Sequence, residues 1–169
     1  MLDIGCQDTK VIALDRAGRV VRFEMNDRCA AGAGRFLEMM ASALGYEISE
    51  FGRAALHGGS ALRLSSMCAV FAESEVVGLV TQGRRREEIA RAVHEAIHRR
   101  TVGMIQRVGT AGPLVFSGGA ARNPCLVRLI ETELGRAVHV PEAPDMVGAY
   151  GAALLAGERA TGAPAKEER

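Results

Sequence analysis

The sequence lacks tryptophan and is poor in aromatic residues, which make up 4% of its 169 residues. Neither sign of charge predominates, since 21 basic residues are balanced by 20 acidic ones and the net charge is +1. This balance argues against nucleic acid or an anionic membrane as the main partner. Cysteines are too few and too scattered for the disulfide framework of a small secreted domain. They are Cys6, Cys29, Cys68 and Cys125.

Long hydrophobic runs are also missing, and no stretch approaches the ~18 consecutive apolar residues of a membrane span. The N-terminal MLDIGCQDTK has no basic segment followed by an apolar core, as a secretory signal peptide would. We therefore expect a cytoplasmic protein whose cysteines stay reduced, as core thiols, reactive thiols or metal ligands. The length fits one domain with one core.

Apolar periodicity predicts alternating strands and helices. A strand is expected to end within residues 2–5, and residues 10–25 are typical of a hairpin that turns at 16–18. Short strands are also expected at 113–117 and 137–140, and helices at 34–44, 71–82, 86–108, 124–134 and 145–157. The chain thus divides into an α/β domain, 1–157, and a polar tail, 158–169, that is expected to fray.

Two glycine-containing turns follow predicted strands. In the first, DIGCQD, Asp3 and Asp8 could orient a Mg²⁺ ion or its waters, and Gly5 would let the backbone approach phosphate oxygens. In the second, SGGAARN, Gly118 and Gly119 would allow a ligand to pass closely. Either turn alone could be a plain connection. Together they indicate a phosphate-bearing ligand at the carboxyl edge of the sheet.

A third motif, NDRCAAGAGRFLEMM, places Cys29 ahead of a glycine-punctuated turn that begins a helix. The first N–H groups of a helix are unsatisfied and its dipole is positive at that end, so negative charge is favoured there. A phosphate, a thiolate or a reduced metal cluster could each use this field.

The motifs DIGCQD, NDRCAAGAGRFLE, SSMCAVFAESEV, FSGGAARN and GAYGAALLA extend over residues 2–157. Through them the chain resembles the ATP-dependent activators of 2-hydroxyacyl-CoA dehydratases and the ATPase subunits of benzoyl-CoA reductase. The resemblance implies the α/β fold of the actin, sugar kinase and Hsp70 ATPases, which is ribonuclease H-like. It also implies that Cys29 and Cys68 bind one [4Fe-4S] cluster shared by the two subunits of a homodimer.

The resemblance further implies ATP or ADP binding with Mg²⁺, and Asp3 and Asp8 as the catalytic residues. ATP hydrolysis would drive a low-potential electron from the cluster to a 2-hydroxyacyl-CoA dehydratase or related reductase, with ferredoxin or flavodoxin as donor. The nucleotide would be bound by Gly5, Gln7, Gly32, Gly34, Arg35, Gly118, Gly119 and Asn123.

Two features depart from the family pattern. Cys6 stands where the phosphate turn normally has glycine, so a side chain intrudes there. Members of the family also begin with an N-terminal half that carries a first phosphate loop, whereas this sequence matches from the second. It therefore resembles the C-terminal half of an activator: a truncated gene, a fragment, or one member of a split pair.

Other interpretations remain open at this stage. A sugar or acyl kinase of the same superfamily would keep the glycine turns and lose the cluster. HEAIH, residues 94–98, matches the H-E-x-x-H zinc hydrolase motif, with Glu131 or His139 as a candidate third ligand. The arginines at 84–86 are either a solvated helix approach or a docking patch for an acidic electron donor.

Several motif residues also have structural interpretations. Arg35 and Glu38 have the spacing of an exposed ion pair on a helix. Cys6 and Cys125 are expected to be packing residues beside the nucleotide site. A cluster bound by all four cysteines of one chain is the alternative to the shared one.

If no other polypeptide supplies the missing half, we expect the protein to hold a cluster as a dimer but to hydrolyse ATP poorly, because the first phosphate loop is absent. The measurement is phosphate release by the purified protein. A rate typical of intact activators would contradict the expectation.

Overall fold

The computed structural model describes residues 1–26, 34–59, 62–64, 69–109 and 112–161. Expectations that involve Cys29, Gly32 and Cys68 lie outside these residues. In chain order the elements are β1 (Leu2–Ile4), β2 (Thr9–Leu14), β3 (Val20–Asn26), α1 (Gly34–Ala43), α2 (Ile48–Leu56), α3 (Ala69–Thr81), α4 (Arg86–Val108), β4 (Phe116–Ser117), the 3₁₀ helix η2 (Gly119–Arg122), α5 (Pro124–Leu134), the 3₁₀ helix η3 (Pro144–Met146) and α6 (Val147–Ala160).

The four strands form one mixed sheet in the order β3-β2-β1-β4. β1 pairs antiparallel with β2 and parallel with β4, with Leu2 opposite Phe116 and Asp3 opposite Ser117. Because β1 and β4 run in the same direction, the turns that follow them meet at one edge of the sheet. This confirms the prediction that both glycine turns lie at the carboxyl edge.

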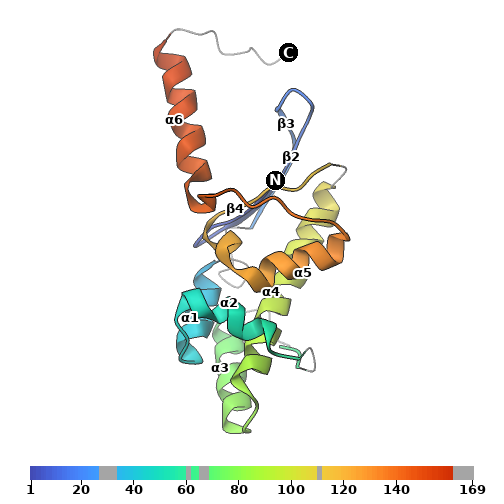
Figure 1. Cartoon of the computed structure of the whole chain (residues 1–169), viewed down its shortest axis with the longest axis vertical. Coiled ribbons are helices and arrows are strands. Elements are labelled where there is room, and N and C mark those ends of the chain that lie inside the picture. Colours follow the sequence, from blue (N-terminus) through green and yellow to red (C-terminus); the bar gives the residue numbers. More distant parts are fainter. Residues whose placement is uncertain (27–33, 60–61, 65–68, 110–111, 162–169) are drawn as a thin grey trace.

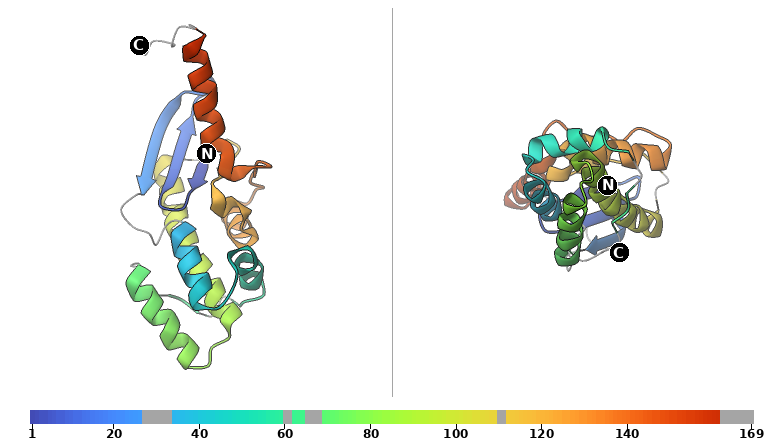
Figure 2. Two further views of the ribbon diagram at one scale, coloured as in Figure 1. Left: turned by 90° about the vertical axis from the view of Figure 1, so that its left-hand side faces the viewer. Right: turned by 90° about the horizontal axis from the view of Figure 1, so that it is seen from below.

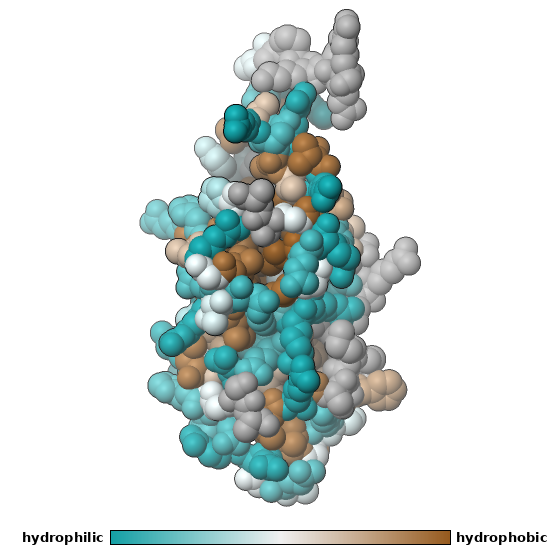
Figure 3. Space-filling model, turned by 90° about the vertical axis from the view of Figure 1, so that its right-hand side faces the viewer, coloured by the Kyte–Doolittle hydropathy of each residue, from teal (hydrophilic) through white to brown (hydrophobic). Residues whose placement is uncertain are grey.

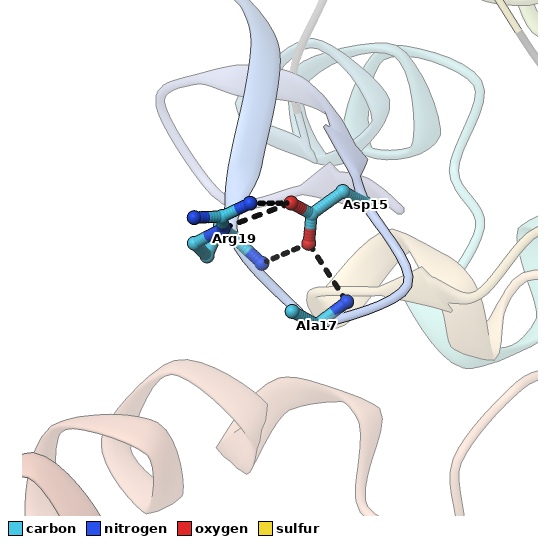
Figure 4. Close-up of polar contacts among 3 residues, drawn as sticks. All are labelled: Asp15, Ala17 and Arg19. Atoms are coloured by element: carbon cyan, nitrogen blue, oxygen red, sulfur yellow. Dashed lines mark hydrogen bonds and ion pairs between the residues drawn. The ribbon is translucent and has the colours of Figure 1, made fainter. Parts of the chain in front are cut away.

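The β2–β3 hairpin turns at the predicted position, and a single carboxylate organises the turn (Figure 4). Asp15 Oδ1 accepts hydrogen bonds from the main-chain N–H of Ala17 at 2.8 Å and of Arg19 at 3.0 Å. The Arg19 guanidinium binds the other oxygen, Oδ2, at 2.9 Å. These bonds stabilise the ionised form and hold the pKa of Asp15 below its ordinary value.

The helices form a layer along α4, which runs from the sheet to the far end of the molecule (Figure 1). α2 and α5 pack on α4, α1 packs on α3 and α4, and α4 reaches β2 and β3 of the sheet. The apolar stripe that predicted α4 is buried: Ile89, Val93, Ile97 and Ile105 are each at most 2% exposed. The core thus lies between this helix and its neighbours.

The structure corrects four expectations about the elements. α2 was not predicted; α3 begins at Ala69; and α6 continues to Ala160, because helix-compatible residues follow Gly157. The strand expected at 137–140 is reduced to a single parallel bridge between Val115 and His139.

Apolar side chains are also exposed on the β2–β3 hairpin, including Val20, Val21 and Phe23, each more than half exposed. Hydrophobic residues reach the surface in several places, in both the upper and the lower parts of the face shown in Figure 3. α6 projects away from the helical layer, and none of its residues is buried (Figure 1). Among the described residues, no helix has both the length and the apolar character needed to cross a membrane.

Gly118, which follows β4, is a backbone position that leaves no room for a side chain. Its φ is +84° and a Cβ would overlap the carbonyl group of Ile4. We expect Gly118→Ala to lower the free energy of unfolding by about 2 kcal/mol or more, because the left-handed conformation is unfavourable for alanine and β1 cannot move away. Urea unfolding measures this effect.

The matched control is Gly119→Ala, whose Cβ would meet no atom within 4 Å. Its unfolding free energy should change by less than about 0.5 kcal/mol. Equal decreases in the unfolding free energy of Gly118→Ala and Gly119→Ala would contradict the special role of Gly118.

Candidate functional site

The two predicted carboxylates, Asp3 and Asp8, have different partners at the carboxyl edge of the sheet. Asp3 Oδ2 accepts a hydrogen bond from Ser117 Oγ at 2.7 Å, which joins the ends of β1 and β4. Asp8, in the turn after β1, forms an ion pair with Lys10 at 2.6 Å. The two carboxylates therefore differ, because the partner of Asp3 is neutral and that of Asp8 is a cation.

The start of α1 is bonded to the turn after β1. The N–H groups of Gly34 and Arg35 donate to the carbonyl oxygens of Gly5 and Cys6 at 2.8 and 2.7 Å. A Cβ on Gly34 would lie 2.9 Å from the Gly5 oxygen, so the two backbones touch without room for a side chain. The helix that follows the Cys29 segment is thus fixed directly to the first glycine turn.

A cavity of about 650 Å³ opens beside this crossing. The two glycine turns, α1, α2, η2 and the start of α5 provide its walls. Its lining is Gly5, Cys6, Gly34, Leu37, Glu38, Ile48, Ser49, Gly52, Arg53, Leu56, Gly119, Ala120, Arg122, Asn123 and Pro124. Apolar walls with a few polar groups and two backbone turns suit a ligand that combines a flat organic group with an anion.

α2 forms one wall and lies directly against the start of α5. A Cβ on Gly52 would be 2.5 Å from Asn123 Oδ1 and 2.8 Å from Pro124 Cδ. Glycine at this position therefore sets how closely α2 approaches the cavity.

Asn123 is also the N-cap of α5. Its Oδ1 accepts from the main-chain N–H groups of Cys125 and Leu126 at 3.1 and 3.2 Å, and Pro124 occupies the first helical position, as predicted. Its Nδ2 lies 2.9 Å from Nε2 of His94, on α4. A polar connection thus runs from the central helix to the cavity wall.

The His94 ring is completely buried, and both of its nitrogens have partners. Since an amide nitrogen can only donate, Nε2 accepts from Asn123, and Nδ1 carries the proton and donates to the Ala90 carbonyl at 2.7 Å. The Phe51 ring of α2 packs on it with centroids 4.8 Å apart. Burial lowers the pKa of His94 to about 4, so the ring is neutral near pH 7.

These bonds oppose the zinc hydrolase interpretation of HEAIH. A zinc ion bound by His94 would have to displace either Asn123 or the Ala90 carbonyl from the imidazole. The histidine belongs to the core instead, as a partner of the α5 cap.

Three charged side chains line the cavity, Glu38, Arg53 and Arg122. Arg122 pairs with Asp145 at 2.6 Å, and Glu38 pairs with Arg35 at 3.0 Å, which is the ion pair that the helical spacing allowed. Arg53 also lines the cavity. The lining therefore includes two guanidinium groups, and Arg122 is already paired with a carboxylate.

The predicted nucleotide residues are only partly brought together. Gly5, Gly34, Gly119 and Asn123 line the cavity. Gln7, Arg35 and Gly118 do not, although Gly118 shapes the turn before η2. Asp3 and Asp8 also lie outside the lining.

The two cysteines expected to pack differ from each other. Cys125 is buried, and burial raises the pKa of its thiol to about 11. Cys6 is exposed and lines the cavity, so its description as a packing residue is wrong. Exposure follows from its place in the turn, where its carbonyl rather than its side chain is bonded to α1.

The residues of α2 that line the cavity were missed: Ile48, Ser49, Gly52, Arg53 and Leu56. A signal for this helix existed in the apolar spacing of Ile48, Phe51 and Ala55, between Gly45 and Gly58. Phe51 and Ala55 are fully buried.

α1 and α3 pack against each other and run in the same direction, with their first residues toward the sheet (Figure 1, Figure 2). α1 begins at Gly34 and α3 at Ala69, the residue after Cys68. The positive ends of two helix dipoles are thus oriented toward the same side of the helical layer.

Comparison with known proteins places this geometry in a family. Residues 1–156 match the BadF/BadG/BcrA/BcrD ATPase family. The 2-hydroxyisocaproyl-CoA dehydratase activator of Clostridioides difficile is 40% identical over 160 residues, which are 95% of this chain and 60% of the relative.

Solved structures have the same arrangement. The activator of the 2-hydroxyisocaproyl-CoA dehydratase from Clostridium difficile, with bound ADPNP, superposes with a TM-score of 0.89 at 38% identity and covers 99% of this chain and 63% of its own. The PilM-PilN type IV pilus biogenesis complex, at 17% identity and a TM-score of 0.52, shares the fold alone, over 91% of this chain and 44% of that one. The predicted fold of the actin, sugar kinase and Hsp70 ATPases is confirmed.

The low pKa of His94 predicts a pH dependence of stability. Between pH 6.5 and about 4 the unfolded chain protonates this histidine and the folded chain does not, so the free energy of unfolding should fall as the pH falls. His94→Gln removes this titration and should lose less stability than the wild type from pH 6.5 to 4.5. Urea unfolding at a series of pH values measures the difference, and parallel curves would contradict a neutral buried ring.

Proposed function

Because the chain belongs to the BadF/BadG/BcrA/BcrD ATPase family, we propose that it carries the nucleotide-binding and cluster-binding parts of an ATP-dependent reductive activator. The activator would pass a low-potential electron to a 2-hydroxyacyl-CoA dehydratase or a related reductase. The relationship to dehydratase activators supports this choice of partner, over the part of their length that the chain spans.

The nucleotide is proposed to occupy the cavity. Its volume and apolar walls accommodate a base and ribose, and the exposed backbone of Gly119 can approach phosphate oxygens. The Arg53 guanidinium in the lining would favour the anionic end of the ligand. The solved activator with bound ADPNP supports a nucleotide as the ligand.

Asp3 is the better candidate for orienting Mg²⁺ or its waters. Mg²⁺ uses one or two carboxylates and keeps several waters. The partner of Asp3 is the neutral Ser117 hydroxyl, whereas Asp8 is already neutralised by Lys10.

The cluster is proposed to be held by Cys29 and Cys68. The observation that carries this proposal is the parallel packing of α1 and α3, each of which follows one of these cysteine segments. A [4Fe-4S] cluster takes four thiolates, so two per chain require a homodimer. When bound, it would supply one-electron chemistry, and the positive ends of the two helices would favour the added charge.

The chain's own contacts offer a route between the two sites. A nucleotide that contacts Gly5 and Cys6 would bear on the same turn whose carbonyls hold Gly34 and Arg35. Movement of that turn would therefore be transmitted to the start of α1. Ferredoxin or flavodoxin is the proposed electron donor and the cytoplasm the proposed compartment.

Anaerobic purification and cluster reconstitution test the proposal. We expect a brown homodimer with about two irons per chain, and loss of most of the iron in Cys29→Ala and Cys68→Ala. Iron and sulfide analysis, absorption spectra and the molar mass in solution are the measurements.

Cys6→Ser and Cys125→Ala are the controls and should keep their iron, since one thiol lies at the cavity and the other is buried in the core. A colourless wild type that binds ATP would favour the kinase interpretation. Loss of iron in the control variants would indicate a cluster bound within one chain.

A further inference from the structure

We infer that His94 is a positioning residue for the cavity: it accepts a hydrogen bond from Asn123 and so fixes the amide that caps α5 at the cavity wall. The inference rests on the proposed function in one respect, that the ligand of the cavity is taken to be a nucleotide. It gives HEAIH a role other than metal binding.

The first step is the rigidity of the histidine. Nδ1 of His94 donates to the Ala90 carbonyl, one turn earlier on the same helix, and Phe51 covers the ring from α2. The ring therefore has a fixed orientation and a fixed tautomer, and it presents Nε2 as an acceptor at a defined place.

The second step is the orientation of the Asn123 amide. Its oxygen faces two main-chain N–H groups and its nitrogen faces Nε2 of His94, so rotation of the amide by 180° would oppose donors to donors and acceptor to acceptor. Asn123 is only 8% exposed, and without His94 one N–H group of its amide would lose its partner in a buried position. The histidine therefore makes one orientation of the cap strongly preferred.

The third step is the connection from the cap to the ligand. Asn123 and its neighbours Arg122 and Pro124 line the cavity, and Gly52 of α2 contacts Asn123 from the opposite side. A displaced amide would move two walls of the cavity together, since no space separates it from α2. His94 does not line the cavity and acts on the ligand only through this contact.

The experiment measures ADPNP affinity by calorimetry in variants that keep or remove the acceptor. His94→Leu keeps an apolar side chain but removes the acceptor, and we expect the Kd to rise about tenfold or more. In His94→Gln the side-chain oxygen replaces Nε2 as acceptor, and the Kd should stay within about threefold of the wild-type value. Both ranges correspond to the loss or retention of a buried hydrogen bond.

His98→Leu is the matched control, because His98 lies one turn further along α4 and has no contact with Asn123 among the hydrogen bonds of the described residues. Its Kd should not change. Asn123→Ser keeps a capping hydroxyl but cannot reach His94 as an amide does, so it should raise the Kd. Adding His94→Leu to Asn123→Ser should raise the Kd little further, because the two residues act through the same hydrogen bond. If His94→Leu does not fold, the single variant Asn123→Ser still tests the inference.

A second measurement does not depend on the ligand. Hydrogen exchange of the Cys125 and Leu126 amides should become faster in His94→Leu and return toward the wild-type rate in His94→Gln. Unchanged exchange and unchanged affinity in His94→Leu would overturn the inference. A wild type that binds no ADPNP would instead overturn the proposed function, and amide exchange would then decide the role of His94.

Discussion

The main chain of α1 touches the turn after β1 so closely that a side chain at Gly34 would collide with the Gly5 carbonyl. Two hydrogen bonds hold this crossing, and the cavity opens beside it. The second glycine turn approaches the same place from β4, since Gly118 packs on the Ile4 carbonyl. Backbone contacts without side chains therefore define where a ligand can reach the sheet edge.

A polar connection through the core stabilises the opposite wall. His94 lies on the buried face of α4, where unpaired polar atoms would be costly. Both of its ring nitrogens have hydrogen-bond partners, so this cost is largely avoided. The connection reaches Asn123, whose buried amide is part of the cavity lining. The cap of one helix is thus held by another helix, and α2 packs on the contact through Phe51 and Gly52.

The arrangement of helix ends also matters for the proposed cluster. α1 and α3 start on the same side of the helical layer and pack against each other (Figure 2). One of them is also fixed to the glycine turn at the cavity. A nucleotide and a cluster would consequently share one mechanical element, α1, whose position depends on two main-chain hydrogen bonds.

Local sequence determined the elements whose patterns are strong: the hairpin with its turn at Asp15–Arg19, the stripe of α4, and α5 between Asn123 and Gly135. It also placed both glycine turns at one edge of the sheet, and the motifs indicated the family. These features depend on periodicity, capping and backbone conformation within a few residues, so they can be recognised without knowing distant contacts.

Tertiary structure alone decided the rest of the site. Nothing near Asn123 in the sequence indicates that His94 holds its amide, or that Gly52 leaves room for it, because these residues meet only when α2, α4 and α5 pack. The exposure of Cys6 and the burial of Cys125 depend in the same way on neighbours brought by the fold. Contacts between residues that are distant in the sequence depend on how the helices pack, so residue type and spacing do not predict them.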